Sequence, residues 1–184
     1  MTVGLRPTEK SKLKEGKLWQ LQQKQLQTKQ DKDFLKAYYK KALSMALDAL
    51  EDDDLQNIFP PCFEDGKIAY GFDSSYLLYR FKYYLYDGIV EDYDLYEIKW
   101  NENGENKSFK LSSLIDEETF GGEGDLFEFL RDCYYFSKDE EVYNEILLPI
   151  IKEQTKLLMK KNGISLDFDY TNEFKYSDWK LIMS

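Results

Sequence analysis

The chain of 184 residues contains no histidine, two cysteines and four prolines. Without histidine it has no Ser-His-Asp or Cys-His catalysis, no histidine-ligated metal and not the commonest general base near neutral pH. Cys62 and Cys133 lie far apart in the sequence, and they fit neither a CxxC pair nor a disulfide framework. We therefore expect a reducing, cytoplasmic location, no metal site and no cofactor, and we favour binding over catalysis.

Long apolar runs are absent as well. The longest runs, such as residues 146–151, are far too short to cross a bilayer, and the N-terminal segment has no apolar stretch typical of a signal peptide. Hydrophobic residues nevertheless make up 42% of the chain and aromatic residues 16%, which is enough to form a core. We expect a folded, soluble protein that makes no membrane contact.

Charge is distributed unevenly along the chain. The total is 35 acidic against 25 basic residues, a formal charge of -10. Residues 1–46 hold 11 basic and 4 acidic residues (+7), whereas residues 47–184 hold 14 basic and 31 acidic residues (-17). This division predicts a basic, Gln- and Lys-rich helical arm over residues 1–30, followed by a single acidic domain over residues 31–184.

The arm has helix-forming residues, but its apolar positions do not form one continuous stripe. One interpretation is a helix that binds nucleic acid or a second copy of the chain. The other is a solvated helix that packs on the acidic domain through its leucines and Trp19. In the first interpretation the phosphate contacts would be Lys10, Lys12, Lys14, Lys17, Lys24 and Lys29.

The rest of the chain predicts an α+β fold. Residues 31–50 have the apolar periodicity of a core helix, which the acidic run 51–54 ends. Residues 67–113 are rich in Tyr, Phe, Ile and Leu with turn signals at short intervals, which favours antiparallel strands. Asp87-Gly88 predicts a hairpin turn after residues 79–86, and residues 101–104 predict a second turn between 95–100 and 108–111. For residues 75–86 the aromatic content favours a strand, although a helix remains an alternative.

Beyond the predicted sheet, residues 125–136 predict a helix. Residues 137–140 match a capping box for a long helix to Lys161, kinked at Pro149, and residues 164–170 and 176–183 fit strands. The predicted fold therefore has N-terminal helices, a central antiparallel sheet of about four strands, and two C-terminal helices packed on that sheet. The inward side of the long helix comprises Tyr143, Ile146, Leu147, Ile150, Ile151, Leu157 and Leu158.

One pattern has an enzyme-like spacing. Asp87 is followed ten positions later by Glu97-Ile98-Lys99, which resembles the D…ExK element of the PD-(D/E)xK nucleases. The resemblance covers about one hairpin. It implies that Asp87 and Glu97 hold a divalent cation and that Lys99 is the catalytic lysine. The alternative is that Asp87 serves only the Asp-Gly turn.

Asp167 and Asp169 are spaced by two on a predicted strand and would share one face, where they could chelate a hard cation. The simpler interpretation is a half-exposed strand, in which polar and apolar residues alternate.

Tyrosines and carboxylates alternate in a stretch around residue 90. Tyrosine offers rigid, amphipathic contact area, and carboxylates attract a basic surface over long range. The alternative is an ordinary solvent-facing hairpin. The candidate partner-binding residues are Tyr83, Tyr84, Tyr86, Asp87, Glu91, Asp92, Tyr93 and Asp94.

The leading hypothesis is a non-enzymatic, protein-binding inhibitor of the immunity or anti-defence type. It would be an anti-CRISPR-like or nucleic-acid-mimicking blocker of a basic nuclease or other nucleic-acid-handling protein. Two alternatives stay open: a nucleic-acid-binding module that uses the basic N-terminal helix, and a divalent-metal nuclease that uses Asp87, Glu97 and Lys99.

Overall fold

The computed structural model describes residues 29–92, 96–112 and 123–184. The chain divides into two compact units. One combines the described parts of residues 1–38 and 86–137, and the other combines Tyr39–Leu85 with Lys138–Ser184. Helix α2 (Lys29–Asp48) runs from the first unit into the second. Both units thus consist of segments that are distant in the sequence.

The first unit contains the start of α2, helix α5 (Asp87–Asp92), strands β3 (Glu97–Glu102) and β4 (Glu105–Lys110), and helix α6 (Glu123–Phe136). Phe34 of α2 meets Trp100 and Phe109 of the hairpin edge-on, with ring centroids 5.3 Å and 6.4 Å apart. Ile98 and Phe109 are paired across the two strands and both are buried. One face of the hairpin therefore forms the core with α2.

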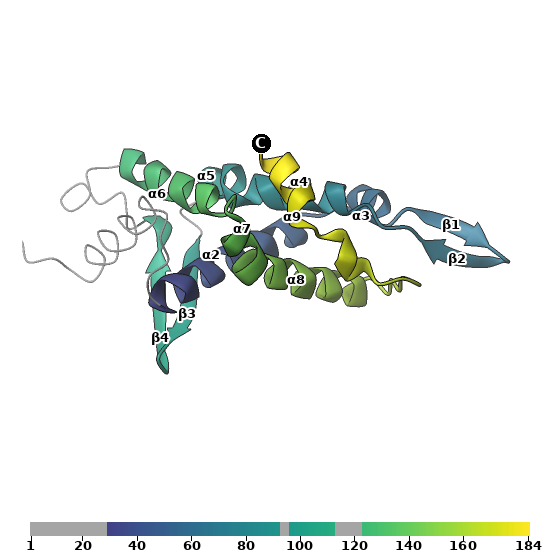
Figure 1. Ribbon diagram of the computed structural model, residues 1–184, viewed down its shortest axis with the longest axis horizontal. Helices are drawn as coiled ribbons and strands as arrows, with labels where there is room; N and C mark the ends of the chain where they lie inside the picture. The colour runs from purple at the N-terminus through teal and green to yellow at the C-terminus, as the bar shows by residue number, and fades with distance from the viewer. Residues whose placement is uncertain (1–28, 93–95, 113–122) are drawn as a thin grey trace, which may run out of the picture. The chain divides into compact units, whose positions relative to one another are not determined.

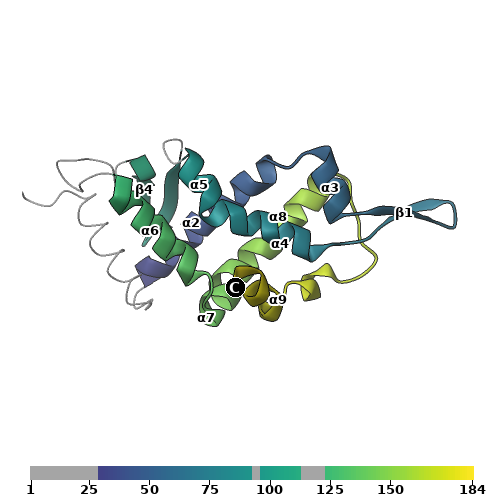
Figure 2. The same cartoon turned by 90° about the horizontal axis from the view of Figure 1, so that it is seen from above.

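The second unit is mainly helical. It contains the remainder of α2, α3 (Asp52–Ile58), α4 (Ser74–Leu85), the short α7 (Glu140–Val142), the π-helical segment η3 (Tyr143–Leu147), α8 (Leu148–Lys161), the 3-10 helix η4 (Tyr170–Glu173) and α9 (Tyr176–Met183). Tyr143 stacks on Trp179 of α9 with centroids 5.6 Å apart, and its hydroxyl donates to the Phe174 carbonyl at 2.9 Å. These contacts hold the C-terminal segment against the core of the unit. Figure 2 shows the course of α9 close to α4.

A second hairpin belongs to this unit. Strands β1 (Pro61–Glu64) and β2 (Lys67–Tyr70) pair antiparallel through a two-residue turn, Asp65-Gly66. Both turn residues have positive φ angles, 52° and 76°, as a type I′ turn requires. Figure 1 shows the two strands running outward beyond the ends of α3 and α4.

The mixture of helix and strand is confirmed, but the sheet prediction is wrong in its arrangement. The four described strands form two separate two-stranded sheets. The strands of β1–β2 are exposed or half-exposed at every position, so helices do not cover that hairpin. At the C-terminus, residues 176–183 form helix α9 rather than a strand, and α9 packs on α4. Residues 164–169 form no strand either.

The strand predicted for residues 75–86 is helix α4. Leu77, Leu78, Phe81 and Leu85 are fully buried, a spacing that places them on one helical face. The Asp73 carboxylate accepts a hydrogen bond from the Tyr76 amide at 3.1 Å and caps the N-terminus of the helix. Period and cap together outweigh the strand preference of the aromatic residues.

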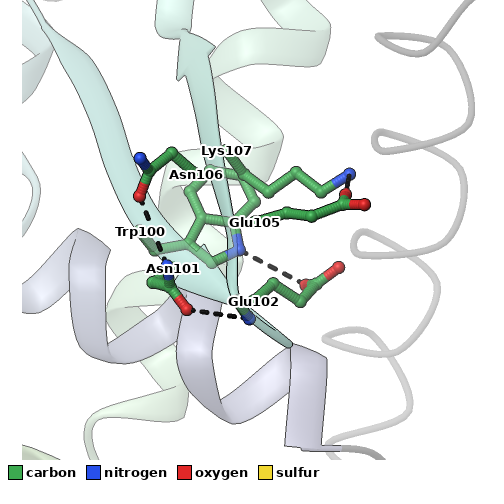
Figure 3. Close-up of polar contacts among 7 residues, drawn as sticks. Trp100, Asn101, Glu102, Glu105, Asn106 and Lys107 are labelled. Atoms are coloured by element: carbon green, nitrogen blue, oxygen red, sulfur yellow. Dashed lines mark hydrogen bonds and ion pairs between the residues drawn. The ribbon is translucent and has the colours of Figure 1, made fainter.

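Asp87-Gly88 is not a hairpin turn but opens helix α5. Ile89 is buried in the first unit, and the Val90 amide donates to the Tyr86 carbonyl at 2.9 Å. The second predicted hairpin is confirmed as β3–β4, with its turn at Asn103 and Gly104, both at positive φ. Figure 3 shows the side chains around that turn.

The long C-terminal helix is confirmed with changes of detail. Its N-cap is Asp139, whose carboxylate accepts from the Glu141 and Val142 amides, whereas the Ser137 hydroxyl donates backward to the Tyr134 carbonyl. The helix passes through η3 just before Pro149, which takes an N-terminal position of α8. Leu157, predicted to face inward, is exposed.

Candidate protein-binding surface

The predicted partner-binding residues do not form one hairpin. Tyr83 and Tyr84 lie at the end of α4 in the second unit, whereas Tyr86 and the α5 residues Asp87, Glu91 and Asp92 belong to the first. Tyr93 and Asp94 lie outside the described residues. The linear stretch is therefore divided between two units, and each part has to be considered separately.

In the first unit, Tyr86 meets Tyr134 of α6 with ring centroids 6.1 Å apart. Burial, and secondly the charge of Asp87, raise the pKa of the Tyr134 phenol. Asp87 itself is exposed at the start of α5, where the helix dipole favours a negative charge. In this part of the candidate set, Tyr86 has a packing role.

In the second unit, tyrosines of α4 reach the surface. Tyr79 and Tyr83 are exposed, and because they are four residues apart they share one side of the helix. Tyr83 packs edge-on against Tyr84 with centroids 5.1 Å apart, and the Arg80 guanidinium lies 5.8 Å from the Tyr84 ring centre. The Tyr84 ring thus contacts both the Arg80 guanidinium and the exposed Tyr83 ring.

The acidic run that follows α2 is the N-terminal end of α3. Asp52, Asp53 and Asp54 occupy its first turn, where the helix dipole favours negative charge. The Asp54 carboxylate accepts from the Glu51 amide at 2.9 Å and from the Tyr76 hydroxyl of α4 at 2.6 Å. The Glu51 bond and then the Tyr76 bond hold the pKa of Asp54 below its ordinary value.

The hydrogen bond from the Tyr76 hydroxyl to Asp54 joins the acidic end of α3 to the tyrosines of α4. Asp54 is engaged in capping and in the bond to Tyr76, whereas Glu51, Asp52 and Asp53 are exposed. Tyr76, Tyr79 and Tyr83 follow one another along one side of α4 at spacings of three and four. We call this set the acidic tyrosine surface: Glu51, Asp52, Asp53, Asp54, Tyr76, Tyr79 and Tyr83.

The nuclease-like residues come from two elements of the first unit, since Asp87 lies on α5 and Glu97 and Lys99 lie on β3. Glu97 and Lys99 are neighbours on the outer face of β3, with Nζ 3.8 Å from Oε1. They line a cavity of about 570 Å³ together with Trp100, Asn106, Lys107 and Ser108. No group of three or more cysteine or carboxylate side chains that could hold a metal occurs within residues 29–92, 96–112 and 123–184. The hairpin that was to join Asp87 to Glu97 is absent, since Asp87 opens α5.

Asp167 and Asp169 lie in the segment before η4, not on a strand. Asp169 is the N-cap of η4, and its carboxylate accepts from the amide and the hydroxyl of Thr171. Those two hydrogen bonds lower the pKa of Asp169. Capping therefore accounts for this carboxylate.

Most of the predicted basic arm lies outside the described residues. Lys10, Lys12, Lys14, Lys17 and Lys24 lie outside the described residues, and Lys29 is the first residue of α2 with an undescribed side chain. In the part of the chain that the structure describes, no helix combines the length and apolar character needed to span a membrane.

Two features of the structure were not predicted from the sequence. The first is the exposed β1–β2 hairpin, for which Asp65-Gly66 was the available signal. The second is Asp132 of α6, whose Oδ2 is buried without a hydrogen-bond partner; no sequence signal marks it. Comparison of the chain with protein-family models, with curated proteins and with solved structures finds no match.

Proposed function

We propose that the chain is a non-catalytic, protein-binding inhibitor that occupies the nucleic-acid site of a basic protein, most simply a nuclease. The observation that carries this proposal is the acidic tyrosine surface, where Glu51, Asp52 and Asp53 present exposed carboxylates at the N-terminal end of α3, which Asp54 joins to Tyr76 of α4. In a basic cleft that binds nucleic acid, carboxylates can take the place of the negatively charged phosphates, and the planar tyrosine rings can take the place of the stacked bases.

The two kinds of side chain contribute differently to binding. Carboxylates steer a basic partner and raise the association rate, an effect that salt screens. Tyr79 and Tyr83 supply contact area at low conformational cost, since tyrosine has two side-chain torsions. Tyr83 is further ordered by its contact with Tyr84, so less freedom is lost when a partner binds.

Binding kinetics test this proposal. The chain is measured against purified nucleases with a pI above about 9 and against acidic enzymes of similar size, across a range of salt concentrations. We expect binding to the basic set only, with an association rate that falls severalfold between about 0.05 and 0.5 M salt. The degree to which nuclease cleavage is inhibited should increase with the fraction of nuclease bound by the chain.

Two matched variants separate charge from stability. Asp52→Asn with Asp53→Asn removes two charges from the surface, and Asp167→Asn with Glu173→Gln removes two at other exposed positions of the same unit. The first pair should slow association severalfold and the second should leave it nearly unchanged. Tyr79→Ser with Tyr83→Ser should instead accelerate dissociation. Equal effects of the two charge pairs, or no binding to any basic nuclease, would rule the proposal out.

A further inference from the structure

The β1–β2 hairpin carries an apolar face that faces solvent. Register pairs Pro61 with Tyr70 and Phe63 with Ile68, and alternation places these four residues on one side. Phe63 is 80% exposed and Ile68 is 55% exposed. Cys62, Glu64, Lys67 and Ala69 occupy the opposite side. We call Pro61, Phe63, Ile68 and Tyr70 the hairpin apolar face.

The base of the hairpin is firmly held. Phe59 and Phe72, which flank the two strands, stack with centroids 5.5 Å apart and an interplanar angle of 21°. The Gly71 amide donates to the Pro60 carbonyl at 2.9 Å, and the Asp73 amide donates to the Ile58 carbonyl at 2.8 Å. A hairpin anchored in this way presents its strands in a preformed conformation, which lowers the entropic cost of adding a further strand.

The free edge of β2 suits that addition. A two-residue turn makes Glu64 and Lys67 a hydrogen-bonded pair, so by alternation the backbone groups of Ile68 and Tyr70 point away from β1. The edge of β1 is blunted by Pro61, which has no amide hydrogen to donate. A partner strand therefore finds its hydrogen-bonding groups along β2, next to the apolar side chains of Ile68 and Tyr70.

The charge around the hairpin defines the partner. Residues 51–73 contain seven acidic residues and a single basic one, Lys67, a net charge of -6. A second copy aligned on this edge would bring two such acidic segments together, which electrostatic repulsion opposes. A strand that alternates basic and apolar side chains matches both the charge and the apolar face.

We propose that the β2 edge and the hairpin apolar face accept an extended, basic strand of a partner protein. This inference rests on the proposed function, because α3, whose N-terminal acids would steer the partner, is the element that precedes β1 in the chain. It adds a second point of contact, made by main-chain hydrogen bonds and two apolar side chains, to the acidic tyrosine surface.

Amide NMR spectra of the isotope-labelled full chain test the proposal with a synthetic peptide as the probe. The peptide alternates Lys and Val over about eight residues, and its counterpart alternates Glu and Val. We expect saturable shifts that are largest at the amides of Ile68 and Tyr70, with the Lys-Val peptide binding at least about tenfold more tightly than the Glu-Val peptide.

Variants of the two hairpin faces provide matched controls. Phe63→Ser with Ile68→Ser should weaken binding of the Lys-Val peptide at least about fivefold, whereas Cys62→Ser with Ala69→Ser, on the opposite face, should leave it unchanged. All four positions are exposed or half-exposed, so neither pair removes core packing.

Several outcomes overturn the inference. Shifts confined to α3 and α4 would leave the proposed function standing and exclude the hairpin as the docking element. Equal affinity for the Glu-Val peptide, or no binding, would also exclude it. Self-association of the free chain that Phe63→Ser with Ile68→Ser abolishes would make a second copy the occupant. Peptide binding at β2 without binding to any basic nuclease would instead reject the proposed function alone.

Discussion

Replacing Asp132 by Asn should stabilise the protein near neutral pH and have little effect in acid. Asp132 lies on α6, and its Oδ2 is buried with no hydrogen-bond partner among the described residues. Burial is the main cause that raises the pKa of this carboxyl to about 6; Glu128, one turn earlier, adds to it, and Arg131 opposes it. The folded protein therefore binds the Asp132 proton more tightly than the unfolded chain does.

The sign and size of the effect follow from proton linkage. In the unfolded chain the carboxyl ionises near its ordinary pKa of 3.8, whereas in the folded protein it is half ionised only at about pH 6. Stability is therefore unaffected below the lower value and falls as the pH rises between the two. The full difference corresponds to at most about 3 kcal/mol, and partial exposure of the side chain reduces the expected loss to about 1 kcal/mol.

Urea unfolding of the wild type and of Asp132→Asn at about pH 4 and pH 7.5 measures this difference. The variant should gain about 1 kcal/mol at the higher pH and close to nothing at the lower. Glu173→Gln, which removes a charge at an exposed position, serves as the control and should show no comparable pH dependence. The same change in stability at both pH values, or a loss at pH 7.5, would refute the reasoning.

Three further substitutions probe the fold by the same unfolding measurement. Tyr143→Phe should cost about 1–2 kcal/mol, because the Phe174 carbonyl loses its buried donor. Asp139→Ala should cost about 1 kcal/mol, because two amides of the first turn of α7 lose their acceptor. Gly66→Ala should cost about 1 kcal/mol from its positive φ angle alone, since a Cβ there meets no atom within 4 Å. No loss in a given variant would contradict the role assigned to that residue.

Sequence reasoning succeeded where one local signal decided the structure. The apolar stripe of residues 31–50 predicted α2, and most of its members, such as Phe34 and Leu43, are fully buried. Asn103-Gly104 predicted the β3–β4 turn, because few residue pairs accept two successive positive φ angles. Both signals are local, and each is compatible with few alternative backbone conformations.

It failed where two signals competed. Residues 75–86 combine a strand-like aromatic composition with a helical apolar period, and the period prevailed because Leu77, Phe81 and Leu85 find a core to fill. Asp87-Gly88 is a turn signal only if strands flank it, and once α4 is a helix that condition fails. Because α4 is a helix, the hairpin predicted at Asp87-Gly88 does not form. The spacing argument that related Asp87 to Glu97 and Lys99 had assumed that hairpin.

The acidic tyrosine surface shares residue types with the stretch predicted around residue 90, but Tyr83 is the one residue that the two sets have in common. Tyr83 is exposed at the end of α4. The carboxylates at the N-terminal end of α3 come instead from residues 51–54, more than twenty positions before Tyr76, and α3 packs against α4, where Tyr76 bonds to Asp54. Proximity across such a separation depends on tertiary packing, which periodicity and turn signals do not encode.

The position of the acidic run also determines what its variants can prove. At the N-terminus of α3, Asp52 and Asp53 interact favourably with the helix dipole, and that interaction alone would justify their presence. Removing both charges should therefore cost roughly 0.5–1 kcal/mol of stability whether or not a partner exists. The loss of the dipole interaction does not, however, lower the rate of association with a partner when the Asp52→Asn, Asp53→Asn variant remains fully folded. That rate, rather than stability, therefore distinguishes a surface that steers a partner from a helix that is only well capped.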